Sequence, residues 1–196
     1  MNVVTQAPVV LTDQQRSFVE DHVMSADFPW FWQATQTHDR RPYFWEEHIP
    51  EELRPNYEVC NAPFFSYTLM ARSFDPEQSG TVVSDYYAVF AEMFDTWMKN
   101  NGLSYTRVYR MNLNLTTYHG SAHTVPHLDH EYDHCNFIMY LDTCPDSQTL
   151  VFDDNFHTTN MFNCEQYTAI AFHRQFHAHR YPPPGLRRTV LVVTYI

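Results

Sequence analysis

Two segments in the first half of the chain carry hydrophobic residues at helical spacing. The first opens with Thr12-Asp13-Gln14-Gln15, a capping-box pattern, and ends at the aromatic cluster Phe28 to Trp32. The second covers residues 84–100, with Ser84 as the candidate N-cap and Asn101-Gly102 as the stop signal. The second helix is hydrophobic enough on one face to pack against a sheet. The apolar positions are Phe18, Val19 and Val23 in the first helix and Tyr87, Phe90, Met93, Phe94, Trp97 and Met98 in the second.

Between these helices the pattern is weaker. The aromatic run from Phe28 to Trp32 is typical of core packing. Residues 39–83 contain several prolines and follow no regular period, repeat or low-complexity pattern. We therefore expect residues 1–103 to be mainly helical support with an irregular segment.

After Gly102 the hydrophobic period changes from helical to alternating. Residues 110–115 read Arg-Met-Asn-Leu-Asn-Leu, which predicts a strand with one polar and one apolar face. The run Pro182-Pro183-Pro184-Gly185 is the connection into the last strand, because proline is excluded from the interior of a sheet. Helices followed by short strands predict an α+β fold with a barrel or double-sheet roll. The further strand candidates are Asn136–Asp142, Thr149–Phe152, Gln166–Phe172 and Arg188–Tyr195.

The charge of the chain limits its partners. The formal net charge is −11 at pH 7, and Lys99 is the only lysine. Each phosphate contact needs a cation, so this balance argues against a nucleic-acid partner. A local basic groove near the C-terminus is the alternative, formed by Arg174, Arg180, Arg187 and Arg188.

Cysteine usage and hydropathy indicate the compartment. The four cysteines, Cys60, Cys135, Cys144 and Cys164, show no C-x-x-C spacing, which fits a reducing environment. No apolar stretch is long enough to span a bilayer, and residues 1–11 do not resemble a signal peptide. We expect a cytoplasmic protein that does not associate with a membrane.

Histidine is distributed unevenly, with nine of the twelve between His119 and His179. This indicates metal or acid–base chemistry in the second half, unless the excess is a chance gathering of partly buried rings. His127-Leu128-Asp129 places an imidazole and a carboxylate two residues apart. On a strand both side chains point the same way, so both can reach one metal ion.

A histidine at the start of a late strand supplies a third ligand. Two histidines and one carboxylate suit Fe(II), because they leave three adjacent coordination positions open for a chelating 2-oxo acid and dioxygen. The distal carboxylate of 2-oxoglutarate then needs a cation, for which arginine offers a bidentate fork. Arg187 and Arg188 follow in the required order, and they face opposite sides of a strand, so only one of them enters the barrel.

This order of motifs resembles the Fe(II)/2-oxoglutarate-dependent oxygenase superfamily, nearest its prolyl-4-hydroxylase-like branch, over Tyr118–Ile196. The resemblance implies a double-stranded β-helix (jelly-roll, cupin-like) barrel at residues 104–196 of a single domain, 1–196, with supporting N-terminal helices. It also implies Fe(II), 2-oxoglutarate and dioxygen. One departure is Asp146-Ser147-Gln148, which replaces the usual Gly-Gly before the LxxF strand. The matching pieces are Tyr118, Pro126–Asp129, Phe137–Asp142, Leu150–Phe152, His177 and Gly185–Arg188.

The resemblance further implies the role of each site residue. The metal ligands would be His127, Asp129 and His177, because Gly185 and Arg187 follow His177 with the family's common H…G-x-R spacing. His179 remains the alternative third ligand, since its distance to Arg188 matches some prolyl hydroxylases. The residues expected to bind 2-oxoglutarate are Arg187, Arg188, Thr189, Tyr140 and Tyr118.

We therefore expect a dioxygenase that hydroxylates an unactivated C–H group of a peptidyl, amino-acid or small polar substrate and releases succinate and CO2. His130 and Tyr132, close to the metal pair, would give the substrate mouth a polar, aromatic character. Three other functions compete with this one. They are a nucleobase-modifying oxygenase of the same superfamily, a cupin-like metal-dependent hydrolase or isomerase, and a non-catalytic metal-binding module.

Overall fold

The computed structural model describes residues 5–34, 62–120, 122–155 and 157–196. No helix in these ranges is long and apolar enough to cross a membrane. The helices are α1 (Asp13–Ser17), η1 (Phe18–Val23, a π-helix) and α4 (Tyr87–Asn100). The strands are β1 (Thr5–Pro8), β2 (Phe31–Gln33), β3 (Phe64–Ala71), β4 (Thr81–Val82), β5 (Val108–Thr117), β6 (Cys135–Tyr140), β7 (Cys144–Phe152), β8 (Thr158–Cys164), β9 (Thr168–His173), β10 (His177–His179) and β11 (Arg187–Tyr195).

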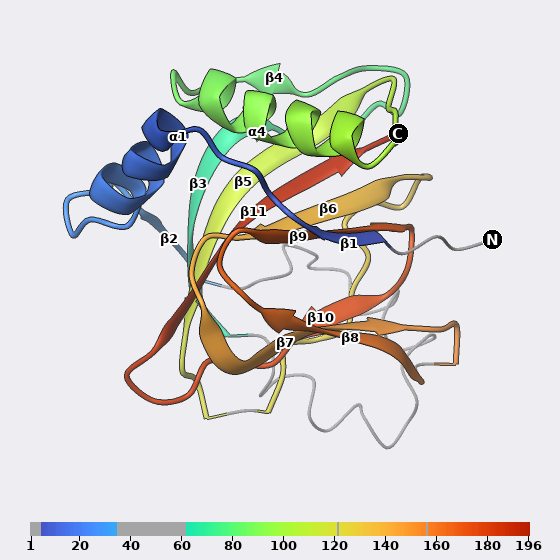
Figure 1. Ribbon diagram of the computed structural model, residues 1–196. Coiled ribbons are helices and arrows are strands. Elements are labelled where there is room, and N and C mark those ends of the chain that lie inside the picture. Colours follow the sequence, from blue (N-terminus) through green and yellow to red (C-terminus); the bar gives the residue numbers. More distant parts are fainter. Residues whose placement is uncertain (1–4, 35–61, 121, 156) are drawn as a thin grey trace.

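The strands form two antiparallel sheets. The larger sheet has the order β1-β9-β6-β11-β5-β3-β2, with β4 beside β3, and the smaller has the order β10-β7-β8. In Figure 1 the helices α1 and α4 lie on one side of the larger sheet and the smaller sheet lies on the other. From β5 to β11 the chain passes repeatedly between the sheets. This is the double-stranded β-helix that the sequence predicted.

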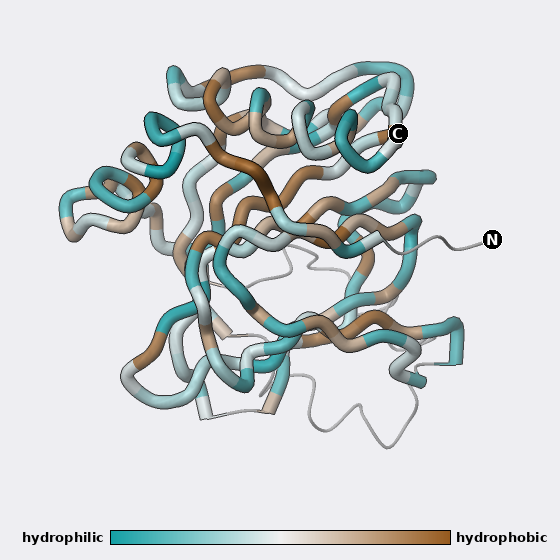
Figure 2. The backbone as a smooth tube through the Cα atoms, viewed as in Figure 1, coloured by the Kyte–Doolittle hydropathy of each residue, from teal (hydrophilic) through white to brown (hydrophobic). Residues whose placement is uncertain are grey.

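Strand β5 shows how the alternating pattern builds these layers. Met111 and Leu113 are fully buried in one cluster with Trp97 of α4. Asn112 and Asn114, which alternate with them, line a cavity on the opposite face of the sheet. Figure 2 shows hydrophobic positions running along the strands beneath the helices. The predicted strand with one apolar and one polar face is confirmed, and its polar face looks into the barrel.

Both predicted helices are present. The capping box forms as expected, because Gln15 N–H donates to the Thr12 hydroxyl and Thr12 N–H donates to the Gln15 side chain. Helix α4 begins at Tyr87 rather than directly after Ser84, whose carbonyl oxygen accepts the Tyr87 N–H. It ends before Gly102, which has a φ of 65°, a left-handed conformation that glycine adopts at little cost.

The expectation of an irregular segment was wrong where the structure describes it. Residues 64–71 form β3, which pairs with β5 from Phe65 opposite Leu115 to Met70 opposite Met111. The sequence Phe-Phe-Ser-Tyr-Thr-Leu-Met has bulky residues on both faces, so no two-residue period is visible. The first 103 residues thus supply β1 to β4 as well as helices. Residues 39–61, including Cys60, lie outside the described residues.

The departure at Asp146-Ser147-Gln148 has a structural explanation. Asp146 adopts a φ of 61°, a left-handed conformation in which aspartate is tolerated better than most side chains. The pairing of β7 with β8 shifts register between Cys144 and Thr149, so these residues form a bulge. The Ser147 hydroxyl donates to the Arg180 carbonyl oxygen at 2.6 Å, which holds the bulge against the chain after β10.

Candidate metal centre and its cavity

The three predicted metal ligands meet at one edge of the smaller sheet. The backbones of His127 and His177 form two N–H···O hydrogen bonds of 3.0 Å, which set the ring centroids 4.5 Å apart. Asp129 Oδ2 lies 3.4 Å from His177 Nε2. One potential ligand atom from each residue lies within 4.8 Å of the others, so the three can share one metal ion. His179 is not part of this group, and the structure therefore brings His177 to the site.

Backbone carbonyl groups orient both imidazole rings. Nδ1 of His127 lies 2.9 Å from the Val125 carbonyl oxygen, and Nδ1 of His177 lies 3.3 Å from that of Gln175. A carbonyl oxygen can only accept, so each Nδ1 carries the proton and each Nε2 keeps a lone pair for a metal. Burial and the neighbouring His127 lower the pKa of His177 to about 3. The ring is therefore neutral at physiological pH, which is the state that binds metals.

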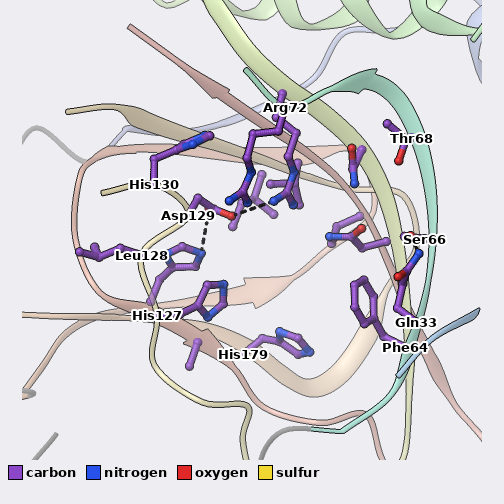
Figure 3. Close-up of a pocket in the computed structure, with 18 of the residues that line it drawn as sticks. Gln33, Phe64, Ser66, Thr68, Arg72, His127, Leu128, Asp129, His130 and His179 are labelled. Atoms are coloured by element: carbon purple, nitrogen blue, oxygen red, sulfur yellow. Dashed lines mark hydrogen bonds and ion pairs between the residues drawn. The ribbon is translucent and has the colours of Figure 1, made fainter. Parts of the chain in front are cut away.

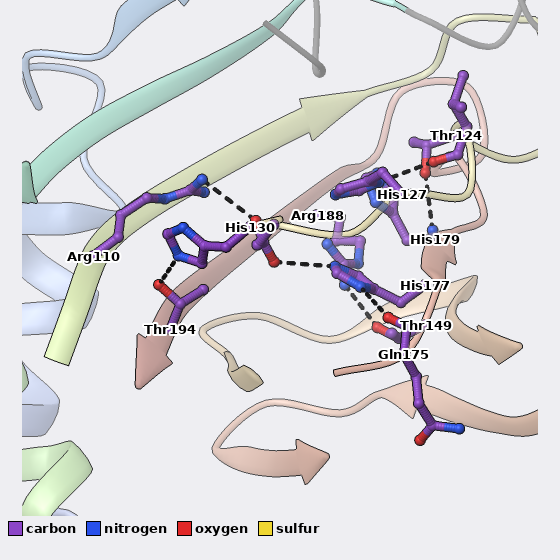
Figure 4. Close-up of polar contacts among 12 residues, drawn as sticks. Arg110, Thr124, His127, His130, Thr149, Gln175, His177, His179, Arg188 and Thr194 are labelled. Atoms are coloured by element: carbon purple, nitrogen blue, oxygen red, sulfur yellow. Dashed lines mark hydrogen bonds and ion pairs between the residues drawn. The ribbon is translucent and has the colours of Figure 1, made fainter. Parts of the chain in front are cut away.

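Arg110 of β5 orients the carboxylate. Its Nη1 lies 3.3 Å from Asp129 Oδ1, a contact that Figure 4 marks with a dashed line at Arg110. Both side chains are largely buried. Burial opposes ionisation of Asp129, but Arg110 and the histidines outweigh it and hold the pKa of this carboxyl well below its usual range. Oδ2 has no hydrogen-bond donor among the described residues, so it is available to a metal. The donor set of two imidazole nitrogens and one carboxylate oxygen fits Fe(II).

A cavity of about 660 Å³ lies between the sheets in front of the triad (Figure 3). Its size falls within the range of small-molecule sites. The wall formed by β3 and β5 is polar, and the side formed by β6 and β11 is mostly apolar. The polar wall residues are Ser66, Thr68, Arg110, Asn112, Asn114 and Thr116, and the apolar ones are Ile138, Val190 and Val192.

Of the two adjacent arginines, Arg188 faces the cavity. Arg188 is 3% exposed, its Nη2 donates to Thr149 Oγ1 at 2.8 Å, and its guanidinium lies 5.5 Å from the centre of the Tyr140 ring. The Tyr140 hydroxyl donates to the same Thr149 oxygen at 2.8 Å. Arg187 is exposed and donates to the Met24 carbonyl oxygen, outside this cavity.

Two other predicted co-substrate residues do not reach the cavity. Tyr118 is 53% exposed and lines a separate depression that also contains Arg187. Thr189 follows Arg188 on β11, so its side chain points to the other face of the sheet, and its N–H donates to Asp142 Oδ1 at 3.1 Å. The expectation that these residues surround one site is therefore corrected: of the five, Arg188 alone is among the described residues that line the cavity, and Tyr140 contacts it through its ring and through Thr149.

His130 and Tyr132 line the cavity, as expected of residues near its mouth. His130 is nevertheless almost completely buried, and its Nε2 lies 2.7 Å from the Thr194 hydroxyl. Arg174 and Arg180, which the nucleic-acid alternative needs, are exposed and are not among the described residues that line the cavity. Sequence reasoning missed Arg72, Arg110 and Thr149 as site residues, although the polar face of β5 was a signal for Arg110.

No protein-family model and no curated protein sequence matches the chain. Solved structures match along nearly its whole length. An oxidoreductase of the 2OG-Fe(II) oxygenase family from Burkholderia pseudomallei has a TM-score of 0.58 and 15% identity, over 99% of this chain and 84% of that one. A prolyl hydroxylase from Trichoplax adhaerens, in complex with a hypoxia inducible factor oxygen degradation domain peptide fragment, has a TM-score of 0.57 and 9% identity, over 98% and 83%. The non-heme alpha ketoglutarate dependent epimerase SnoN from nogalamycin biosynthesis has a TM-score of 0.55 and 11% identity, over 98% and 77%.

At identities of 9–15% this likeness speaks to the fold alone. It agrees with the two-sheet topology. The chain therefore has the double-stranded β-helix fold of the Fe(II)/2-oxoglutarate oxygenases.

Proposed function

We propose that the protein is an Fe(II)- and 2-oxoglutarate-dependent dioxygenase that hydroxylates an unactivated C–H group and releases succinate and CO2. The observation that carries the proposal is the convergence of His127 Nε2, His177 Nε2 and Asp129 Oδ2 on one point at the wall of a cavity. Bound Fe(II) would supply the open positions at which a 2-oxo acid and dioxygen react. His127, Asp129 and His177 would hold the metal, and Arg110 would keep the carboxylate in place.

The remaining residues of the proposed site would bind the co-substrate. Arg188 offers a buried guanidinium in the lining of the same cavity, and Thr149 and Tyr140 hold it in position. Such a fork suits the distal carboxylate of 2-oxoglutarate. The Tyr140 hydroxyl stays protonated, because burial raises the pKa of Tyr140 to about 12 despite the nearby Arg188. It can therefore keep donating to Thr149 Oγ1 throughout the physiological pH range.

The substrate we propose is an amino-acid or peptidyl side chain or another small polar molecule. The polar wall of β3 and β5 supports this class, and one protein of the same fold, the Trichoplax prolyl hydroxylase, was solved with a peptide. The net charge of −11 and the position of Arg174 and Arg180 outside the cavity lining argue against a nucleobase substrate.

The test is 2-oxoglutarate turnover. Purified protein is incubated with Fe(II), ascorbate, 2-oxoglutarate and candidate substrates in air, and succinate is followed by mass spectrometry. Asp129→Ala should abolish both Mn(II) binding and succinate release. Asp133→Ala removes an exposed carboxylate that pairs with His173 and serves as the matched control. The proposal is wrong if the wild type binds a metal but neither binds nor consumes 2-oxoglutarate, which would favour the hydrolase or the non-catalytic module.

A further inference from the structure

A second cationic group lies in the cavity, on the side away from Arg188. Arg72 directly follows β3 and lines the cavity with Arg110 of β5. Figure 3 shows Arg72 on the side of the cavity where Asp129 and His130 lie. Arg110 is paired with that carboxylate. Within the described part of the chain, no hydrogen bond or ion pair reaches the Arg72 guanidinium.

Arg72 and Arg110 place two guanidinium groups in the lining of one cavity, and Asp129 is paired with Arg110. Placing two like charges in one partly buried cavity costs free energy unless an anion lies between them. The structure therefore keeps an unfavourable charge arrangement next to the triad that a bound anion would relieve.

The position of Arg72 is fixed on both sides by its neighbours. Ala71 pairs with Thr81 of β4. Ser73 N–H donates to the Tyr109 carbonyl oxygen at 3.0 Å, and the Ser73 carbonyl oxygen accepts the Tyr132 hydroxyl at 2.7 Å. A backbone held in this way keeps the Arg72 side chain on this side of the cavity, and the side chain itself is ordered only when a ligand binds.

Two carboxamides complete this side of the cavity. Asn112 lies opposite Thr68 of β3, and Asn114 lies opposite Ser66. Both Oδ1 atoms are buried, and among the described residues neither side chain has a hydrogen-bond partner. Buried polar groups are rarely left unpaired, so a ligand with its own donors and acceptors is expected here.

The charges that line the cavity are unlike those of the whole protein. Among the described lining residues, three arginines (Arg72, Arg110 and Arg188) accompany two carboxylates, Asp129 and the exposed Glu131, in a chain whose net charge is −11. A divalent metal adds two positive charges, and 2-oxoglutarate removes two. The metal and the co-substrate together therefore leave the positive excess at the substrate side unchanged.

We propose that Arg72, with Arg110 beside it, binds a carboxylate of the substrate, while Asn112 and Asn114 bind its other polar groups. The substrate is then a small carboxylic acid with further hydrogen-bonding groups, such as a free amino acid. The inference rests on the proposed function, because it assigns the opposite end of the cavity to 2-oxoglutarate. It narrows the substrate class to molecules that carry a negative charge near the hydroxylated carbon.

The experiment measures binding, so it does not depend on turnover. Protein loaded with Mn(II) is first titrated with 2-oxoglutarate by calorimetry. The complex of protein, metal and 2-oxoglutarate is then mixed with each common L-amino acid and, separately, with the α-amide of that amino acid. Binding is ranked by nuclear magnetic resonance, with diamagnetic Zn(II) in place of Mn(II). N-acetyl-aspartic acid α-amide reports whether a side-chain carboxylate is accepted instead. The variants are Arg72→Gln and, as the control, Arg107→Gln, whose arginine contacts Glu77 and Pro76.

We expect at least one acid to bind about ten- to a hundredfold more tightly than its amide, the range of a charge-assisted hydrogen bond. Arg72→Gln should remove this preference without weakening 2-oxoglutarate, and Arg107→Gln should retain it. Equal binding of acids and amides, binding of no acid, or an unchanged preference in Arg72→Gln would each overturn the inference. Weaker 2-oxoglutarate binding in Arg72→Gln would also overturn it, because Arg72 would then serve the co-substrate. If the wild type does not bind 2-oxoglutarate, the proposed function has failed and this inference falls with it.

Discussion

Substitution of Arg188 offers the most direct test of which residue binds 2-oxoglutarate. Its side chain is 3% exposed, its Nη2 donates to Thr149 Oγ1, and its Nε has no partner among the described residues. Within those residues no carboxylate lies at ion-pair distance from it. A guanidinium that has lost water without gaining an acidic partner should bind a carboxylate strongly.

The change is Arg188→Gln, which removes the charge and keeps a donor for Thr149. One hydrogen bond to a charged group contributes about 1.5–3 kcal/mol, and a bidentate pair contributes more. We therefore expect a loss of about 2–4 kcal/mol, which raises the Kd of 2-oxoglutarate about thirtyfold to several hundredfold. Arg188→Lys should fall between this variant and the wild type, because it keeps the charge but not the planar fork.

The assay is calorimetric titration of the Mn(II)-loaded protein with 2-oxoglutarate. Arg187→Gln is the matched control, since Arg187 is exposed and contacts the Met24 carbonyl oxygen outside the cavity. Its Kd should stay within about twofold of the wild type, as for most surface substitutions. The reasoning is refuted if Arg188→Gln binds 2-oxoglutarate like the wild type, or if Arg187→Gln weakens binding more.

Three further predictions concern metal binding, pH and stability. Arg110→Met should raise the Kd for Mn(II) about ten- to a hundredfold, because Asp129 loses the cation that orients it; an unchanged Mn(II) titration would contradict this. Burial raises the pKa of Asp142 in the folded protein above its value in the unfolded chain. The free energy of unfolding of the wild type therefore falls as pH rises from the unfolded-state pKa through the folded-state pKa. Urea unfolding should accordingly show Asp142→Asn to be more stable than the wild type at about pH 7 and no more stable at about pH 4. Equal stability of the two proteins at both pH values would refute this prediction. Trp97→Ala should cost about 3–5 kcal/mol in urea unfolding, because Trp97 is 1% exposed and packs edge-on against Phe137, and a loss below about 1 kcal/mol would show that the site repacks.

The sequence by itself determined the elements with strong local patterns. Helix α4 and strand β5 were predictable because their apolar residues recur at one period and the opposite face is polar. The pair His127 and Asp129 could be named as candidate ligands because residues two apart on a strand point the same way, and because further motifs follow the pair in order. The late histidine and the arginines could be named because the proposed chemistry requires them in that order.

Only the tertiary structure decided which of these residues meet. His177 rather than His179 joins the triad because its backbone pairs with His127, and that register depends on how β10 lies beside the earlier segment. Arg188 rather than Arg187 enters the barrel because the register of β11 with β5 and β6 sets which face of the strand is inward. A one-residue shift in pairing would reverse that choice without any change in sequence pattern.

The contacts that other residues make with the metal ligands could not be predicted from the sequence either. Arg110 reaches Asp129, and Arg72 lines the same cavity, although these residues are distant along the chain. Strand β3, which Arg72 directly follows, has bulky residues on both faces, so its sequence shows no two-residue period. Contacts between strands depend on register and on the sheet a strand joins, and these are set by packing of the whole domain. The local pattern therefore determined the elements and the chemistry, and the fold determined the geometry of the site.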